Sequence, residues 1–289
     1  MILTLLQGGG STFGVITSAT IKAYPSAPFV TATVFMGTIP GNNAYWDVVT
    51  SILSQYPSLD DQGISCYSFI APSFSSAEFN ITSPINSYIG TFLLPALHPS
   101  NSSDSLKSAI NEIVTGATAP YPFQFFTSVT TQTYPDFWAW YSVSNGPLGA
   151  NHDQILGSRL LDGKALTGNL TALKETYQKI TPKGSITSIY LVGGKNVMNA
   201  QPRGGSNAVN PAWRKAYVHS RRSHYTLTSI NPSLIVVTVV GVGWAPFDTV
   251  GKAQQENLLT NTYVEAFRQL APDMGAYINE VSLSNGARC

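Results

Sequence analysis

The chain has 289 residues, of which only 11% are charged and 43% are hydrophobic, and its formal net charge is +1. Such a composition excludes a disordered chain, and the small net charge gives no reason to expect nucleic acid or an anionic membrane as a partner. No apolar run reaches the ~18 residues that a membrane span needs. The length is enough to bury a sizeable core, in one large domain or two ordinary ones.

Hydrophobic periodicity predicts the elements of the first half of the chain. Period-two alternation indicates strands, and apolar residues at spacings of three and four indicate helices. The predicted elements are, in chain order, a strand over 15–24, a strand over 29–38, a helix over 45–56, strands over 64–71 and 85–93, and a helix over 106–114 entered through Ser102 or Ser103.

The second half continues the same pattern of strands with occasional helices. Its predicted elements are a strand over 123–131, a helix over 170–180, strands over 186–192, 216–227 and 234–242, and a long helix over 259–270 that ends before Pro272. The apolar strand over 234–242 is expected at the centre of the sheet. This order predicts an α+β fold, with an antiparallel sheet and helices packed on one of its faces.

Three sequons favour a secreted protein. Asn80, Asn101 and Asn169 each begin an Asn-x-Ser/Thr tripeptide, the acceptor pattern for N-linked glycans. The two cysteines, Cys66 and Cys289, are too few for a disulfide scaffold and leave their pairing open. We expect an extracellular glycoprotein.

A glycine-rich segment near the start is the most distinctive feature of the sequence. Glycines allow a backbone to approach a phosphate or a flat ring closely, although a bare glycine triplet alone indicates only a flexible turn. Rossmann and P-loop sites both need a helix after the glycines, whereas a period-two strand follows here. The segment reads Gly8-Gly9-Gly10-Ser11-Thr12-Phe13-Gly14 and leads into Val15 and Ile16.

From Gly8 to Pro25 the sequence resembles the signature that closes the PCMH-type FAD-binding domain of the vanillyl-alcohol-oxidase/berberine-bridge-enzyme family. Two further segments, Asn210-Pro-Ala-Trp-Arg214 and Gly275-Ala-Tyr-Ile-Asn-Glu280, resemble a motif in the substrate domain and the start of the berberine-bridge segment of secreted microbial members. These members include isoamyl alcohol oxidase-like and oligosaccharide oxidase-like proteins. The resemblance implies an FAD-domain remnant with its terminal strand over 1–25, a substrate-binding domain over 26–270, and a berberine-bridge segment over 271–289.

The resemblance also implies a cofactor and its contacts. FAD would take a hydride from a small-molecule alcohol, sugar or amine, and O2 would reoxidise it. Family members carry further flavin-binding segments upstream and have Arg where this sequence has Gln7, so we expect an incomplete flavin site that does not retain FAD alone. The implied flavin contacts are Gly8, Gly9, Gly10, Ser11, Thr12, Gly14, Val15, Ile16, Tyr277 and Asn279.

A catalytic base is expected on the predicted strand over 216–227. In the resembling family, a sheet residue of the substrate domain faces the flavin and removes the substrate proton. Tyr217 and His219 alternate onto one face of this strand, and either side chain could do that work. The alternative reading of Tyr217 is a packing residue, and Tyr190 on a neighbouring strand is the next candidate.

Other polar and aromatic clusters have simpler interpretations. The four histidines show no metal-ligand spacing, so no metal site is expected. The basic residues Arg214, Lys215, Arg221 and Arg222 are expected to form a solvated edge. The aromatic run over 123–141 is expected to be core, with a platform for a sugar or flat substrate as the alternative.

Two rival functions remain beside the oxidase. The chain could be a non-enzymatic extracellular binding module made of the substrate domain alone, or an inactive gene product. A flavin loop of the Arg-Ser/Thr-Gly-Gly-His type encoded upstream would favour the enzyme.

Overall fold

A computed structural model gives the fold of the chain. The residues that it describes are 8, 15, 17–76, 81–144, 154–202, 205, 207–223, 242–245 and 247–280.

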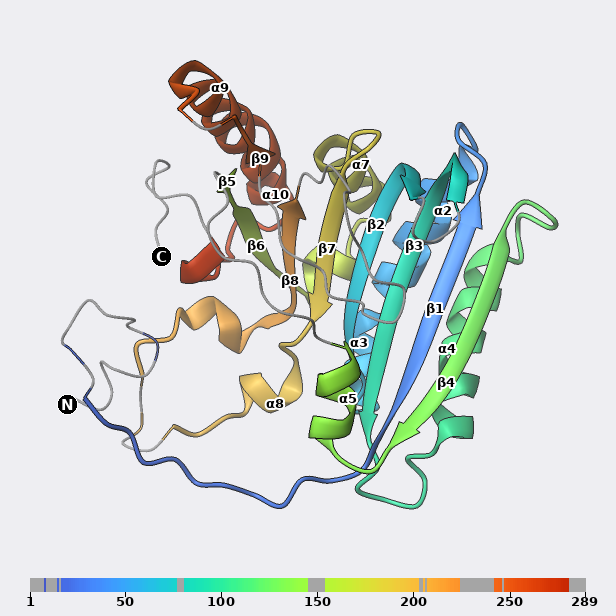
Figure 1. Cartoon of the computed structure of the whole chain (residues 1–289), viewed down its shortest axis with the longest axis vertical. Coiled ribbons are helices and arrows are strands. Elements are labelled where there is room, and N and C mark those ends of the chain that lie inside the picture. Colours follow the sequence, from blue (N-terminus) through green and yellow to red (C-terminus); the bar gives the residue numbers. More distant parts are fainter. Residues whose placement is uncertain are drawn as a thin grey trace.

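Seven strands form one antiparallel sheet in the order β4-β1-β3-β2-β7-β8-β6 (Figure 1). The register is continuous between β1 and β3, and it shifts once between β6 and β8, after Leu161. A separate pair joins β5 (Gln154–Ile155) to β9 (Val242–Gly243). The strands of the large sheet are β1 (Phe29–Thr38), β2 (Ser65–Ser76), β3 (Ile81–Pro95), β4 (Phe126–Tyr134), β6 (Gly157–Asp162), β7 (Ile186–Leu191) and β8 (Ala216–Ser223).

Helices cover one face of this sheet, where the main hydrophobic core lies. Alternate residues of β1, Val30 to Met36, are buried there in one core cluster with residues of α2 (Ala44–Ser54), α4 (Ser103–Thr118) and α7 (Leu170–Ile180), and α4 packs directly on β1. Ser102 caps α4 and Asn169 caps α7, each accepting a backbone N–H of the first turn. The predicted α+β fold, with an antiparallel sheet and helices packed on one face, is confirmed.

The remaining helices are short or lie at the ends of the chain. Pro57 sits in the first turn of α3, which explains why the predicted helix over 45–56 is followed by a second one. In chain order they are α3 (Tyr56–Asp61), α5 (Phe137–Ser144), α6 (Gly163–Thr167), α8 (Lys195–Met198), η1 (Pro211–Arg214), α9 (Thr249–Leu258), η2 (Leu259–Val264), α10 (Glu265–Leu270) and η3 (Ile278–Glu280). No helix in the described part of the chain is long and apolar enough to cross a membrane.

One local prediction was wrong, and a second was wrong in part. The described residues of the segment over 15–24 form no strand, and Val15 and Ile21 are 93% and 86% exposed. An alternating pattern makes a strand only where another strand pairs with it, and no described strand does so here. The aromatic run over 123–141 is core only in part: Phe123, Phe126 and Trp138 are exposed, whereas Phe125 packs against the main core and Tyr134 is buried. Its strand begins at Phe126 rather than Phe123.

Other predictions fall outside the described residues or remain open. The apolar strand over 234–242 lies outside the described residues except for Val242. Cys289 also lies outside them, and Cys66 is a buried free thiol. Burial raises the pKa of Cys66, which makes its thiol unreactive.

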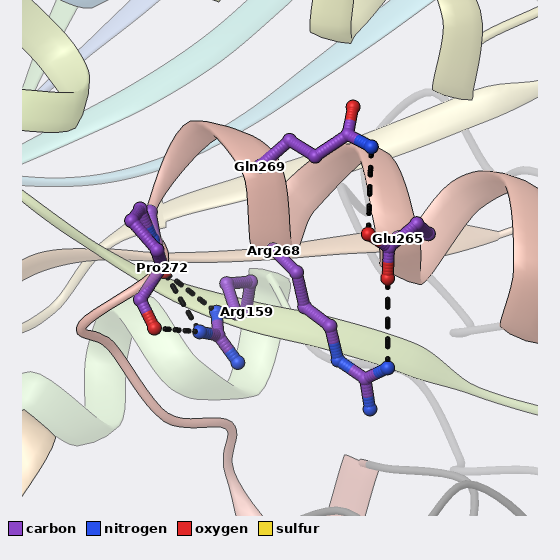
Figure 2. Close-up of polar contacts among 6 residues, drawn as sticks. Arg159, Glu265, Arg268, Gln269 and Pro272 are labelled. Atoms are coloured by element: carbon purple, nitrogen blue, oxygen red, sulfur yellow. Dashed lines mark hydrogen bonds and ion pairs between the residues drawn. The ribbon is translucent and has the colours of Figure 1, made fainter.

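Residues 271–280, which we call the C-terminal strap, pass around the edge strand β6. The Leu160 amide donates to the Gly275 carbonyl at 2.9 Å, and the Arg159 guanidinium donates to the carbonyls of Ala271 and Pro272 (Figure 2). The strap thereby carries residues 277–280 from the end of α10 to the sheet face opposite the main helices.

Candidate functional site

The sheet face opposite α2, α4 and α7 carries two cross-strand rows of mostly polar residues. Directly opposed residues of an antiparallel pair share a face, so the register defines each row. One row is Ser158–Arg221–Ser188 across β6, β8 and β7. The next row is Leu160–His219–Tyr190–Tyr67–Thr91 across β6, β8, β7, β2 and β3. We call the surface formed by these residues the polar face.

Arg221 is the centre of this face. Its side chain is only 2% exposed, and its two terminal nitrogens are both engaged. Nη1 donates to Glu280 Oε1 at 2.8 Å, and Nη2 donates to the Tyr190 hydroxyl at 2.6 Å. The guanidinium carbon also lies 5.0 Å from the centroid of the Tyr190 ring. A buried cation is tolerated only when it is paired and hydrogen-bonded in this way.

His219 is buried among aromatic rings beside Arg221. Its ring centroid lies 5.6 Å from that of Tyr277 and 6.1 Å from those of Trp213 and Tyr190. Burial, and secondarily the charge of Arg221, lowers the pKa of His219 to about 3. His219 is therefore neutral near pH 7, and its 3.5 Å approach to Glu280 Oε2 is a polar contact rather than an ion pair.

Glu280 shares the same buried environment. Desolvation raises the pKa of its carboxyl group, and the charge and hydrogen bond of Arg221 oppose that rise. The pairing with Arg221 keeps a carboxylate there compatible with burial.

The neutral, buried His219 predicts acid-sensitive stability. The unfolded chain binds a proton on this histidine below about pH 6.5, whereas the folded protein does so only near pH 3. The free energy of unfolding should therefore fall by about 1.4 kcal/mol per pH unit as the pH drops below 6.5. The raised pKa of Glu280 acts in the opposite sense, because the folded state takes up that proton first, so the decline should flatten as Glu280 protonates.

Urea unfolding at pH 7, 6 and 5 measures this slope. The variant His219→Gln, which cannot titrate, should lose most of the dependence between pH 6.5 and 5. The same slope in the variant and the parent protein would show that other groups cause it.

The polar face also contains most of the unsatisfied buried polar atoms of the described residues. Buried polar groups nearly always have hydrogen-bond partners in folded proteins, so a group of exceptions needs an explanation. Apart from Thr50 on α2, all such atoms lie on this face or on the strap: Thr91 Oγ1, Ser158 Oγ, Ser188 Oγ, His219 Nε2, Arg221 Nε and Glu280 Oε2. No group of three His, Cys, Asp or Glu among the described residues could hold a metal ion.

The glycine-rich segment is described only in part. Residues 9–14 and 16 lie outside the described residues, so the proposed flavin contacts Gly9, Gly10, Ser11, Thr12, Gly14 and Ile16 remain predictions. Gly8 has a φ of 101°, and it packs so closely on Val209 that a Cβ atom at this position would lie 2.5 Å from the Val209 backbone nitrogen. Only glycine fits both conditions.

The structure brings together the three segments on which the family resemblance rests. Val209, against which Gly8 packs, immediately precedes Asn210. The Asn210 side chain donates to the Ala276 carbonyl at 3.4 Å, and the Trp213 ring lies 5.9 Å from that of Tyr277. These contacts put Tyr277 next to His219, although the Asn279 side chain is outside the described residues.

The two proposed catalytic residues separate in the structure. The Tyr217 ring points toward Gly163, at the beginning of α6. A Cβ atom added at Gly163 would lie 3.4 Å from Tyr217 Cε2. His219 instead faces Tyr190 and Tyr277, although both residues belong to β8. The assignment of either as the base stays a prediction.

Sequence reasoning missed the residues that organise the site. Arg221 was expected on a solvated edge and is instead almost fully buried. The signal that could have revealed it is its parity with His219 on one strand, which puts both side chains on the same face. Glu280 gave no such signal, because it reaches Arg221 from 59 residues away.

Curated relatives match nearly all of the chain, although no protein-family model does. The chain is 28% identical over 290 residues to an uncharacterized FAD-linked oxidoreductase of Arthroderma benhamiae, covering 97% of this chain and 44% of the relative. It is 27% identical over 289 residues to an FAD-linked oxidoreductase of Hypomyces subiculosus, covering 95% of this chain and 41% of the relative. The chain thus spans less than half the length of these relatives.

Solved structures identify the class of fold. A VAO-type flavoprotein of Myceliophthora thermophila superposes with a TM-score of 0.71 at 20% identity, over 92% of this chain and 43% of that one. A xylooligosaccharide oxidase of the same organism gives a TM-score of 0.53 at 16% identity, over 98% and 53%. The fold is therefore that of part of a vanillyl-alcohol-oxidase-type flavoprotein. The resemblance found in the sequence is confirmed, since the curated relatives are FAD-linked oxidoreductases.

Proposed function

We propose that this chain supplies the substrate-side sheet of an FAD-dependent oxidoreductase that oxidises a small alcohol, sugar or amine. The observation that carries the proposal is the polar face, where a buried Arg221 bonds a tyrosine hydroxyl amid unsatisfied polar atoms. The names of the curated relatives, all FAD-linked oxidoreductases, support the cofactor. A similar structure is a xylooligosaccharide oxidase, which supports a sugar among the candidate substrates.

The chemistry that the flavin supplies when bound is acceptance of a hydride from the substrate carbon. The residues suited to contact it are His219, Tyr277 and the segment that begins at Gly8. The rings of Trp213, Tyr277 and His219 form an aromatic wall that would keep water from this end of the face. We propose O2 as the acceptor that restores the oxidised enzyme.

The proton of the substrate hydroxyl needs a base, and Tyr190 suits this role better than the residues first considered. The Arg221 guanidinium donates to its oxygen at 2.6 Å, and this charge-assisted hydrogen bond holds the oxygen in a fixed position on the polar face. His219 is a weak base, because its pKa of about 3 lies far below a neutral working pH. Tyr217 lies apart from the cluster.

The absorption spectrum of the purified protein tests the proposal. The protein should be produced from its whole reading frame, since the FAD-linked relatives are more than twice as long. A flavin spectrum that bleaches anaerobically with an alcohol, sugar or amine supports the oxidoreductase. A colourless protein that still binds one of these compounds would favour the non-enzymatic binding module instead.

We also propose that the protein is secreted and glycosylated. Asn169 is exposed at the start of α7, and Asn101 lies in the turn before α4, both positions that a glycan can occupy. Asn80 lies outside the described residues. Expression in a eukaryotic secretion host should give a protein whose mass falls on treatment with an endoglycosidase, and the variant Asn169→Gln should lose one glycan. An unchanged mass after treatment would contradict this proposal.

A further inference from the structure

Glu280 links the C-terminal strap to the polar face. The strap is held on β6 by the Leu160–Gly275 hydrogen bond and by Arg159, and it is held on the loop before η1 by Asn210. From these anchors it delivers the Glu280 carboxylate to Arg221, with Oε1 at 2.8 Å from Nη1. The carboxylate therefore comes from an element outside the sheet that carries its partner.

The contacts of Arg221 show why this carboxylate matters for geometry. The guanidinium is planar, so fixing Nη1 fixes the direction of Nη2 as well. Nη2 is the nitrogen that donates to the Tyr190 oxygen. The flanking row residues Ser158 and Ser188 do not restrain the head group, since their Oγ atoms and Arg221 Nε all lack hydrogen-bond partners. Within the described residues, Glu280 is the carboxylate that orients this arginine.

We propose that Glu280 is a positioning residue, whose carboxylate holds the Arg221 guanidinium in the orientation that donates to the Tyr190 hydroxyl. The inference rests on the proposed function, in which Tyr190 is the base. Glu280 acts through Arg221 and does not itself contact the reacting atoms. The strap is then part of the catalytic geometry as well as a cover for the edge strand.

Nitrogen-15 NMR of the arginine side chains in the purified 289-residue chain tests the positioning directly and needs neither flavin nor substrate. A guanidinium held at both terminal nitrogens rotates slowly and gives separate Nη signals, whereas a free one gives an averaged signal. We expect separate signals for Arg221, assigned by their loss in Arg221→Lys. Glu280→Ala should average them, and Glu280→Gln should keep them separate, because its amide oxygen can still accept from Nη1.

A matched control is available on α10. Glu265 contacts Arg268 and Gln269 at the surface, at 3.6 and 3.4 Å (Figure 2). Glu265→Ala should leave the Arg221 signals unchanged. If Glu280→Ala unfolds the chain, Glu280→Gln still decides the question, since averaged signals in this folded variant would overturn the proposal.

The rate of flavin reduction in the flavin-loaded enzyme then tests whether the orientation of Arg221 affects the reaction. Misplacing a catalytic group by about 1 Å can cost up to ~10²-fold, so Glu280→Ala should slow reduction by about 10- to 100-fold, with a smaller change in substrate binding. Glu280→Gln should retain most of the rate. Separate Arg221 signals in Glu280→Ala would overturn the positioning role. Averaged signals with an unchanged rate would instead overturn the role of Tyr190 as base.

Discussion

Replacing Tyr190 by Phe should slow anaerobic reduction of the enzyme-bound flavin by about 10²–10⁴-fold, the usual contribution of a general base. The change removes only the phenol oxygen that accepts from Arg221 and keeps the ring, which packs against Tyr67 at a centroid distance of 4.9 Å. Substrate binding should change little, whereas the free energy of unfolding should fall by about 1–3 kcal/mol, because the buried Arg221 Nη2 loses its acceptor. Stopped-flow absorbance, normalised to bound flavin, measures the rate.

Two variants at the alternative candidates serve as comparisons. In the variant Tyr217→Phe the bound flavin should be reduced at a near-normal rate, because the Tyr217 ring lies against Gly163 and away from the Tyr190–Arg221 pair. His219→Ala should lower stability more than it lowers the rate per folded molecule. If flavin reduction were slow in one of these variants and normal in Tyr190→Phe, the residue replaced in the slow variant would be the base instead of Tyr190.

Replacing Arg221 by Met should cost about 3–5 kcal/mol of unfolding free energy, since it leaves the partly buried Glu280 carboxylate without its charged partner. The Tyr190 hydroxyl loses its donor in the same change. Neutralising both partners, in Arg221→Met with Glu280→Gln, should restore part of this loss, because no unpaired charge remains. Urea unfolding of the two single variants and the double variant gives the coupling energy.

Arg268→Met is the matched control for this cycle. Arg268 pairs with Glu265 at 3.6 Å on a partly exposed surface of α10, where an ion pair contributes about 0–1 kcal/mol (Figure 2). If Arg221→Met and Arg268→Met lowered the free energy of unfolding equally, Arg221 would not be held as a buried cation.

The sequence could predict the sheet because its strands bury one face against helices. Alternation in Phe29–Thr38 and the capped helix after Ser102 follow directly from local pattern, and both appear in the structure. The strand over 15–24 shows the limit of such reasoning. Its alternation is as clear, yet pairing depends on a partner that local pattern cannot identify.

The site was less predictable, because its key contacts join distant residues. Tyr190 and Arg221 are 31 residues apart, and the Glu280 carboxylate comes from a segment wrapped around the sheet edge. Composition assigns an arginine such as Arg221 to the surface, since arginines are rarely buried unless they are paired. The pairing that overrides this expectation exists only in three dimensions. His219 was found by alternation alone, but its burial and neutral state also depend on Trp213 and Tyr277.

A crystal structure of the flavin-loaded protein is the most direct test of the central claim, that the polar face is the substrate side of a flavin site. We expect the flavin ring on the side of the sheet that bears Tyr190, His219 and Arg221, with room for a substrate between the ring and the Tyr190 oxygen. Several of the unsatisfied atoms, among them Ser188 Oγ and His219 Nε2, should then have partners in ligand or ordered water. A flavin ring bound on the helix-covered side, or beyond reach of the polar face, would contradict the account.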